Sequence, residues 1–197
     1  MQHKKVASWA LLAFVVVVGG LWFFQRSRTM KEQNAEKAYY QARQAAAAGN
    51  LPLAVSDLKK VVTRYEGTRG GTQAAIFLAQ GLYQQKKPQE GIDELKAALD
   101  DAPEIFVPSI HALIGNGYEE LRNFVAAADA YREAARTTEF PGEKAGHLAS
   151  AGRAYMAAGK AVEARAIWAD LAKDETGPMA AEARVRLGEL EAKPMKT

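Results

Sequence analysis

The side chains that could carry out catalysis or hold a metal ion are few and scattered along the chain. The three histidines are His3, His111 and His147, and none stands at ligand spacing from another histidine or from a carboxylate pair. The acid pairs Asp100-Asp101 and Glu119-Glu120 are adjacent in sequence, so the two members of each pair point to different faces of a helix. We therefore expect no enzyme activity, no catalytic residue, no metal site and no cofactor.

The glycine pair and two of the histidines have a structural explanation. Gly70-Gly71 lacks the GxxxxGK[ST] context of a phosphate-binding loop, and we interpret it as a connector between helix pairs. His111 is expected to pack in or beside the core, and His147 to be solvated near the start of a helix. Cysteine is absent, which excludes disulfides, thiolate metal sites, a cysteine nucleophile and a lipid-modified cysteine.

Composition favours an all-α fold, because 48% of the residues are hydrophobic and only 7 of 197 are proline. The formal charge of +3 is unevenly distributed: residues 1–31 hold five basic residues and no acid, which leaves 21 basic against 23 acidic residues in the rest of the chain. The basic character belongs to the N-terminus. Without a basic stripe on the remaining chain, we expect no nucleic acid partner.

The segment from Val6 to Phe24 contains 19 residues and no charged side chain. As a helix it is about 28 Å long, close to the hydrocarbon thickness of a bilayer. We expect an uncleaved transmembrane helix over residues 6–24, within an N-terminal anchor over residues 1–31. A cleaved secretory signal is one alternative, but Gln25-Arg26-Ser27-Arg28 follows where a small-x-small cleavage site is needed. A buried core helix is the other alternative, although a helix that is apolar all round needs a larger protein around it.

The positive-inside rule does not decide the orientation, because two basic residues precede the segment and three follow it closely. A short tail before the span and a large domain after it are typical of a signal anchor. We therefore expect a single-pass protein of the inner (cell) membrane, with its domain on the periplasmic or extracytoplasmic side.

An internal repeat occupies the rest of the chain. A small residue recurs at Ala54, Gly91, Ala127 and Ala164, at separations of 37, 36 and 37 residues. Around it, aromatic or aliphatic residues keep constant offsets, as in Gly115, Tyr118, Ala127, Tyr131 and Ala134 and again in Gly152, Tyr155, Ala164, Trp168 and Leu171. We expect the recurring residue to be buried where two helices cross, and we expect Gly91 to accept alanine.

Turn signals divide this region into helix pairs. Those within pairs lie at residues 49–52, 87–88, 122–123 and 159–160, and those between pairs at 67–71, 102–103 and 140–142. We expect eight helices, with the first continuing without a break from the membrane segment as a rigid stalk. A ninth, amphipathic helix over residues 178–193 is expected to cap the open end, with Ala183, Val185, Leu187 and Leu190 as its apolar positions. The predicted domain spans residues 32–193, followed by a tail at 194–197.

Over residues 34–173 the repeats resemble tetratricopeptide repeats, although their spacing exceeds the standard 34 residues by two or three. The resemblance implies an α-solenoid of about four helix pairs in which the first helix of each pair lines a concave protein-binding groove. On that resemblance, the residues expected to line the groove are Tyr39, Arg43, Gln73, Ile76, Gln80, Tyr83, Asn116, Glu119, Arg153 and Met156.

A membrane span followed by a small repeat domain also resembles the ancillary subunit family of the bacterial Sec translocon. This resemblance implies a membrane-anchored scaffold or chaperone-like factor whose partners are proteins at the translocon or cell envelope, with the bilayer contacted through residues 6–24. The alternative is a structural adaptor that tethers a cytosolic, cell-division or envelope-assembly complex to the membrane. The two hypotheses share a fold and differ in topology.

Overall fold

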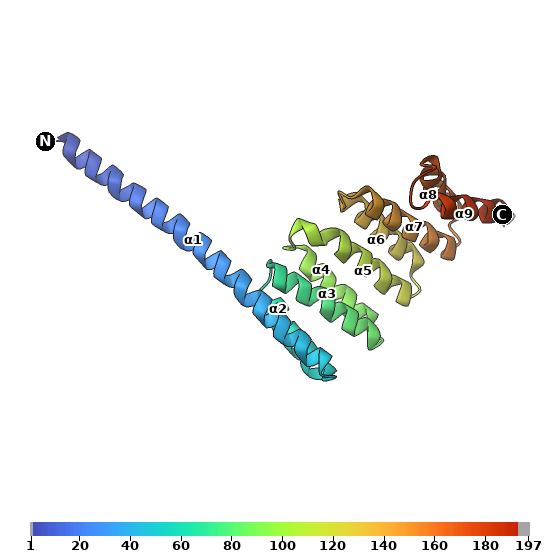
Figure 1. Ribbon diagram of the computed structural model, residues 1–197, viewed down its shortest axis with the longest axis horizontal. Helices are drawn as coiled ribbons and strands as arrows, with labels where there is room; N and C mark the ends of the chain where they lie inside the picture. The colour runs from blue at the N-terminus through green and yellow to red at the C-terminus, as the bar shows by residue number, and fades with distance from the viewer. Residues whose placement is uncertain (1, 193–197) are drawn as a thin grey trace.

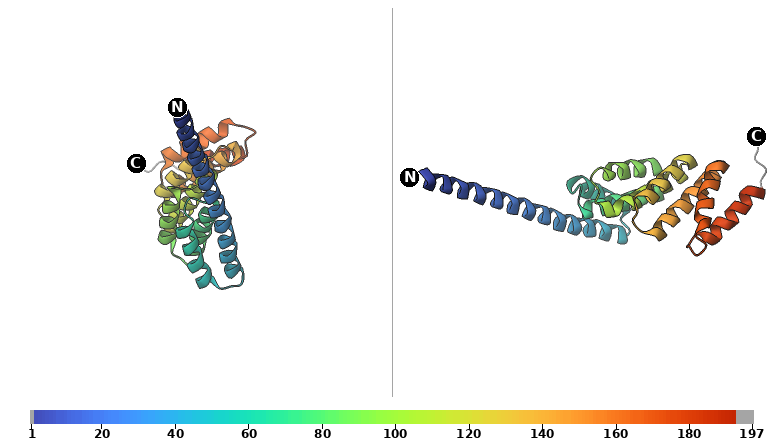
Figure 2. Two further views of the ribbon diagram at one scale, coloured as in Figure 1. Left: turned by 90° about the vertical axis from the view of Figure 1, so that its left-hand side faces the viewer. Right: turned by 90° about the horizontal axis from the view of Figure 1, so that it is seen from above.

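The computed structural model describes the backbone of residues 2–192 and the side chains of residues 16–192. Every regular element in this part of the chain is helical. The helices form an elongated stack, and the N-terminal part of the first helix projects from one end of it (Figure 1). The right-hand view of Figure 2 also shows the start of α1 and the last helix at opposite ends of the molecule.

The first helix, α1 (Gln2–Ala47), runs without interruption for 46 residues, or about 69 Å. Its second half packs against the first repeats and buries Ala35 and Ala42. Its projecting part exposes Val16 to Val18 and Leu21 to Phe24. The expected unbroken helix from the apolar segment into the domain is therefore confirmed for the backbone of residues 2–47.

Among the residues whose side chains the structure describes, no helix is long and apolar enough to cross a membrane. The expected span over residues 6–24 lies partly outside that part, because the side chains of residues 6–15 are not among those described. His3 and the expected tail at 194–197 also lie outside the described residues.

Four helix pairs and a final helix follow the predicted register. Residues 2–192 contain, after α1, the helices α2 (Leu51–Arg64), α3 (Arg69–Gln84), α4 (Pro88–Leu99), the short 3₁₀ helix η1 (Glu104–Phe106), α5 (Val107–Glu120), α6 (Phe124–Thr137), α7 (Pro141–Ala157), α8 (Ala161–Lys173) and α9 (Ala180–Ala192). Each second helix contacts both its partner and the first helix of the next pair. The predicted all-α solenoid with four pairs and a capping helix is confirmed. The prediction that Val185 belongs to the apolar face of α9 is wrong, because its side chain is 60% exposed.

All four turns within pairs have the same backbone geometry. One residue in each adopts a left-handed conformation: Gly49 at φ 81°, Lys86 at 60°, Arg122 at 57° and Gly159 at 72°. The amide of the next residue donates to the carbonyl five residues back, as Asn123 does to Tyr118 at 2.8 Å. This is the Schellman arrangement, which caps the carbonyl end of a helix and reverses the chain.

The recurring small residues lie where paired helices cross. Ala54, Gly91, Ala127 and Ala164 are all buried. In the last two pairs a large ring covers a glycine: a β-carbon built on Gly115 would lie 2.6 Å from the Tyr131 ring, and one on Gly152 would lie 2.7 Å from the Trp168 indole. The helices can therefore approach each other only because one side of the contact has no side chain.

Two predictions about glycine are wrong. Gly70 and Gly71 are not a connector, because they form the first turn of α3 and are buried. A β-carbon on Gly70 would lie 2.5 Å from the Ala35 backbone, so glycine is needed for α3 to approach α1. Gly91 also cannot accept alanine freely. A β-carbon built on Gly91 would lie well inside van der Waals contact of the Tyr83 ring.

Replacing Gly91 with alanine should therefore destabilise the protein by about 1–3 kcal/mol, the usual effect of overpacking. Gly81→Ala is the matched control, because Gly81 lies within helix α3 with open space around the position of its β-carbon. That control should gain up to about 1 kcal/mol from helix propensity. Urea unfolding of both variants measures the difference, and equal effects would contradict the packing at Gly91.

The left-handed turns predict a second pair of effects. Lys86→Gly should stabilise the protein by about 0.5–1 kcal/mol, because the relief of the left-handed strain exceeds the entropy that glycine adds to the unfolded chain. The ion pair lost with Lys86, to Glu120 at 3.4 Å, is exposed and contributes little.

Gly159→Ala is the converse variant, since open space surrounds its β-carbon position and only its φ of 72° opposes a side chain. It should destabilise by about 1 kcal/mol. Thermal unfolding of both variants measures these changes, and shifts of the same sign would show that these turns do not hold the left-handed conformation.

Candidate functional site

A hollow of about 460 Å³ lies on the inner face of the solenoid, bordered by α1, α3, η1, α5 and α7. We call it the inner groove. Of the ten residues predicted for such a groove, four line it: Tyr39, Gln73, Ile76 and Gln80. Six further residues complete the lining: Phe77, Phe106, Ser109, Ala112, Leu113 and His147.

Arg43 lies at the margin of the inner groove. Its guanidinium carbon is 5.7 Å from the centroid of the Tyr39 ring and 5.7 Å from that of the Phe77 ring. Tyr39 belongs to α1 and Phe77 to α3, so one exposed arginine bridges the aromatic side chains of two first helices. A cation above an aromatic face stabilises such a contact by about 0.5–1 kcal/mol at an exposed site.

The lining residues missed from the sequence have different origins. Phe77 directly follows the predicted Ile76, and both side chains line the hollow. Phe106 comes from η1, in the connection that the sequence marked only as a turn at Ala102-Pro103. His147 was expected to be solvated, whereas it is partly buried in the lining. Burial lowers the pKa of its imidazole, and the nearby Glu143 carboxylate offsets this in part.

Tyr83, by contrast, is part of the packing between repeats. Its ring covers Gly91, and its hydroxyl donates to the Leu113 carbonyl oxygen at 3.0 Å. A β-carbon on Gly117 of α5 would lie 2.5 Å from the same hydroxyl. Burial raises the pKa of this phenol well above its ordinary value. Tyr83 therefore connects the second and third repeats and does not face the inner groove.

Asn116 and Glu119 lie further along α5, beside the ring that crosses from α6. The Asn116 side-chain oxygen accepts a hydrogen bond from the Tyr131 hydroxyl at 2.6 Å. Burial raises the pKa of the Tyr131 phenol, and the Glu119 carboxylate raises it further. Both predicted residues are exposed, but Asn116 is already engaged within its own repeat.

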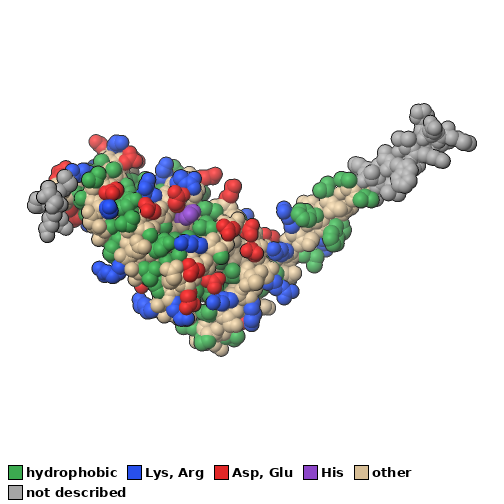
Figure 3. Space-filling view, turned by 180° about the vertical axis from the view of Figure 1, so that it is seen from behind, with side chains coloured by type: hydrophobic (Ala, Val, Ile, Leu, Met, Phe, Trp, Pro, Cys, Tyr) green, Lys and Arg blue, Asp and Glu red, His purple; other side chains and the backbone are tan. Residues whose placement is uncertain are grey.

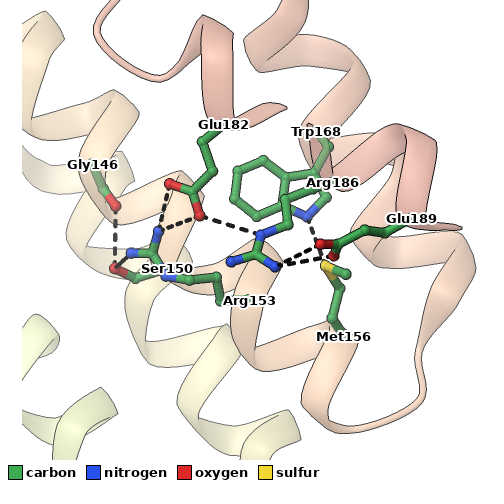
Figure 4. A network of polar contacts seen from close by, with 8 residues as sticks. All are labelled: Gly146, Ser150, Arg153, Met156, Trp168, Glu182, Arg186 and Glu189. Atoms are coloured by element: carbon green, nitrogen blue, oxygen red, sulfur yellow. Dashed lines mark hydrogen bonds and ion pairs between the residues drawn. The ribbon is translucent and has the colours of Figure 1, made fainter. Parts of the chain in front are cut away.

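Arg153 and Met156 are engaged at the C-terminal end of the solenoid, as Figure 4 shows. The Arg153 guanidinium contacts both oxygens of Glu182 on α9, at 3.0 and 2.9 Å. Glu182 also pairs with Arg186 at 3.4 Å. The Met156 sulfur accepts a hydrogen bond from the Trp168 indole at 3.3 Å. These residues therefore fasten α9 and the last pair together.

His111, expected to pack, is partly buried, and burial lowers the pKa of its imidazole.

Within the described residues, no three side chains among His, Cys, Asp and Glu gather closely enough to hold a metal ion. On the face drawn in Figure 3, basic and acidic side chains are interspersed over the repeats and form no continuous basic stripe. The inner groove combines aromatic and aliphatic side chains, with Tyr39, Ile76, Phe77, Phe106, Ala112 and Leu113 in its lining.

No family model matches this chain, and no curated protein matches it. Solved structures do match it. MamA is 16% identical, with a TM-score of 0.59 over 77% of this chain and 82% of that one. The TPR-like repeats of the Podosopora anserina putative kinesin light chain are 14% identical, with a TM-score of 0.60 over 82% of this chain and 87% of that one. BtubC from P. vanneervenii is 14% identical, with a TM-score of 0.57 over 83% and 66%. At these identities the likeness establishes the fold alone, which is a tetratricopeptide-like α-solenoid.

Proposed function

We propose that this chain is a membrane-anchored scaffold that binds other proteins as extended segments along the inner groove. The observation that carries the proposal is the groove itself, a hollow of about 460 Å³ that crosses four consecutive first helices. A surface that continues from repeat to repeat suits an elongated ligand better than a compact one.

The chemistry of the lining supports a polypeptide ligand. Phe77, Phe106 and Leu113 offer apolar contact area, while Gln73 and Gln80 can both donate and accept hydrogen bonds. Because burial lowers its pKa, His147 is uncharged at neutral pH and adds a further neutral donor or acceptor. None of the ten described lining residues is Asp, Glu, Lys or Arg. The groove therefore suits apolar side chains and the polar groups of a peptide backbone.

The proposed role is binding without catalysis. The groove brings together no nucleophile with a general base: Ser109 is exposed on α5, and His147 lines the hollow from α7. No hydrogen bond joins these two side chains among those the structure describes. Amide, aromatic and aliphatic groups dominate the lining, and these recognise ligands without transforming them.

Anchoring through residues 6–24 is the second part of the proposal. It is supported by the 19 uncharged residues of this segment and by the exposure of its described apolar side chains, from 47% at Val18 to 70% at Phe23. A contiguous apolar surface of this kind on a projecting helix calls for an apolar environment. We place the repeats on the extracytoplasmic side of the cell membrane, where the scaffold would meet proteins at the translocon or in the envelope.

Topology separates this role from the alternative of an adaptor that tethers a cytosolic complex to the membrane. Alkaline phosphatase fused after Thr197 should be active, because this reporter needs disulfides that form only after export. A fusion to β-galactosidase at the same position is the control and should be inactive. A stable but inactive phosphatase fusion together with an active β-galactosidase would place the repeats in the cytosol and favour the adaptor.

Filling the inner groove tests the binding site. Gln80→Trp with Ser109→Trp places two large side chains on exposed positions of the lining, where surface substitutions change stability by only about 0.5 kcal/mol. Ser56→Trp with Gln89→Trp makes the same replacements on exposed positions of α2 and α4, outside the groove.

The readout is photo-crosslinking in native membranes from a probe residue at Gln73. We expect polypeptide adducts in the parent and in the control variant, and a reduction of about tenfold in the filled variant. Equal adduct yields in all three proteins would show that the partner does not use this groove.

A further inference from the structure

A second hollow, of about 480 Å³, lies where the projecting part of α1 meets the first repeat. We call it the junction hollow. Arg26 and Lys31 border it from α1, and Arg64, the last residue of α2, borders it from the other side. It adjoins the exposed apolar stretch that ends at Phe24, and Phe23 of that stretch is part of its lining.

The charge of the junction hollow is positive. Its described lining includes three basic side chains and no Asp or Glu. Within the described residues, Arg26, Lys31 and Arg64 form no ion pair with a carboxylate. The Lys31 ammonium donates to the Glu66 backbone carbonyl oxygen at 2.8 Å, which leaves its charge uncompensated. The nearest acid of α1, Glu32, accepts instead from the Arg69 amide at 3.1 Å.

The same hollow has an apolar side. Phe23, Met30 and Tyr65 line it together with the cations. Phe23 is 70% exposed and Met30 52% exposed, so neither is covered by the rest of the protein. One turn away, the Arg28 guanidinium lies 4.4 Å from the centroid of the Phe24 ring, which extends the mixed basic and aromatic surface towards the apolar stretch. Figure 3 shows basic side chains around this junction.

From these features we infer that the junction hollow binds the phosphate of an anionic phospholipid headgroup, with the upper acyl chain against Phe23 and Met30. This inference rests on the proposed membrane anchoring. A phosphate oxygen accepts hydrogen bonds from guanidinium and ammonium groups, and clusters of Lys and Arg beside a membrane helix recognise anionic lipids. A lipid ligand accounts for both the cations and the exposed apolar side chains, whereas a free phosphate accounts only for the cations.

The experiment uses the full-length protein in a nonionic detergent, with native mass spectrometry to count bound lipid. Phosphatidylglycerol is titrated against phosphatidylcholine, and inorganic phosphate is added as a competitor. The test variant is Arg26→Gln with Arg64→Gln. The control, Arg136→Gln with Arg184→Gln, makes the same change of charge at exposed positions of α6 and α9.

We expect the parent and the control to prefer phosphatidylglycerol, and the test variant to bind it about thirtyfold more weakly. Equal binding of phosphatidylglycerol by the test variant and the parent would overturn the site. Displacement of the lipid by millimolar inorganic phosphate would show a phosphate site without lipid specificity and would overturn the lipid assignment.

A separate measurement distinguishes failure of the anchor from failure of this site. The parent is mixed with vesicles of pure phosphatidylcholine and floated on a density gradient. Failure to float would overturn the anchoring in the proposed function. Flotation together with no preference for phosphatidylglycerol would overturn the junction hollow as a lipid site and leave the anchor intact.

Discussion

The close crossing of two helices at a small residue is the contact on which the rest of this structure depends. In the third and fourth pairs the glycine of the first helix lies directly under a ring from the second, Gly115 under Tyr131 and Gly152 under Trp168. The rings of Tyr131 and Trp168 are only 4% and 0% exposed, so each crossing places a large buried ring against a residue without a side chain. Dispersion and apolar burial there favour one separation and one angle between the helices.

That crossing also decides how neighbouring pairs stack. Tyr83 covers Gly91 of its own pair and reaches Gly117 and the Leu113 carbonyl oxygen of the next first helix. Its position is therefore determined by two pairs together. Because each pair is held to the next by such contacts, the first helices lie in one row, and the inner groove is the surface that this row leaves uncovered.

The sequence was sufficient to predict the helix pairs, their register and the positions of the turns, because these follow from local patterns. Each small residue of the series spaced by 36 and 37 residues makes its contact within its own helix pair. Turn residues such as Gly49 and Gly159 also act within one pair. The groove was predicted less completely, since it depends on contacts between distant segments. Arg153 was expected to face the groove, but Glu182 engages it from 29 residues further along the chain. Phe106 lines the groove from a connection whose 3₁₀ conformation has no periodic signal.

The continuity of α1 has a mechanical consequence for the anchoring that we propose through residues 6–24. Between Lys31 and Ala47 the helix contains no glycine or proline, and its Tyr39 forms part of the groove lining. The direction in which the groove faces is thus set by helical phase, since one residue added to the stalk would turn it by about 100° about the α1 axis and raise it by about 1.5 Å. Under the proposed function, the number of residues in the stalk would determine the direction from which a partner approaches the groove.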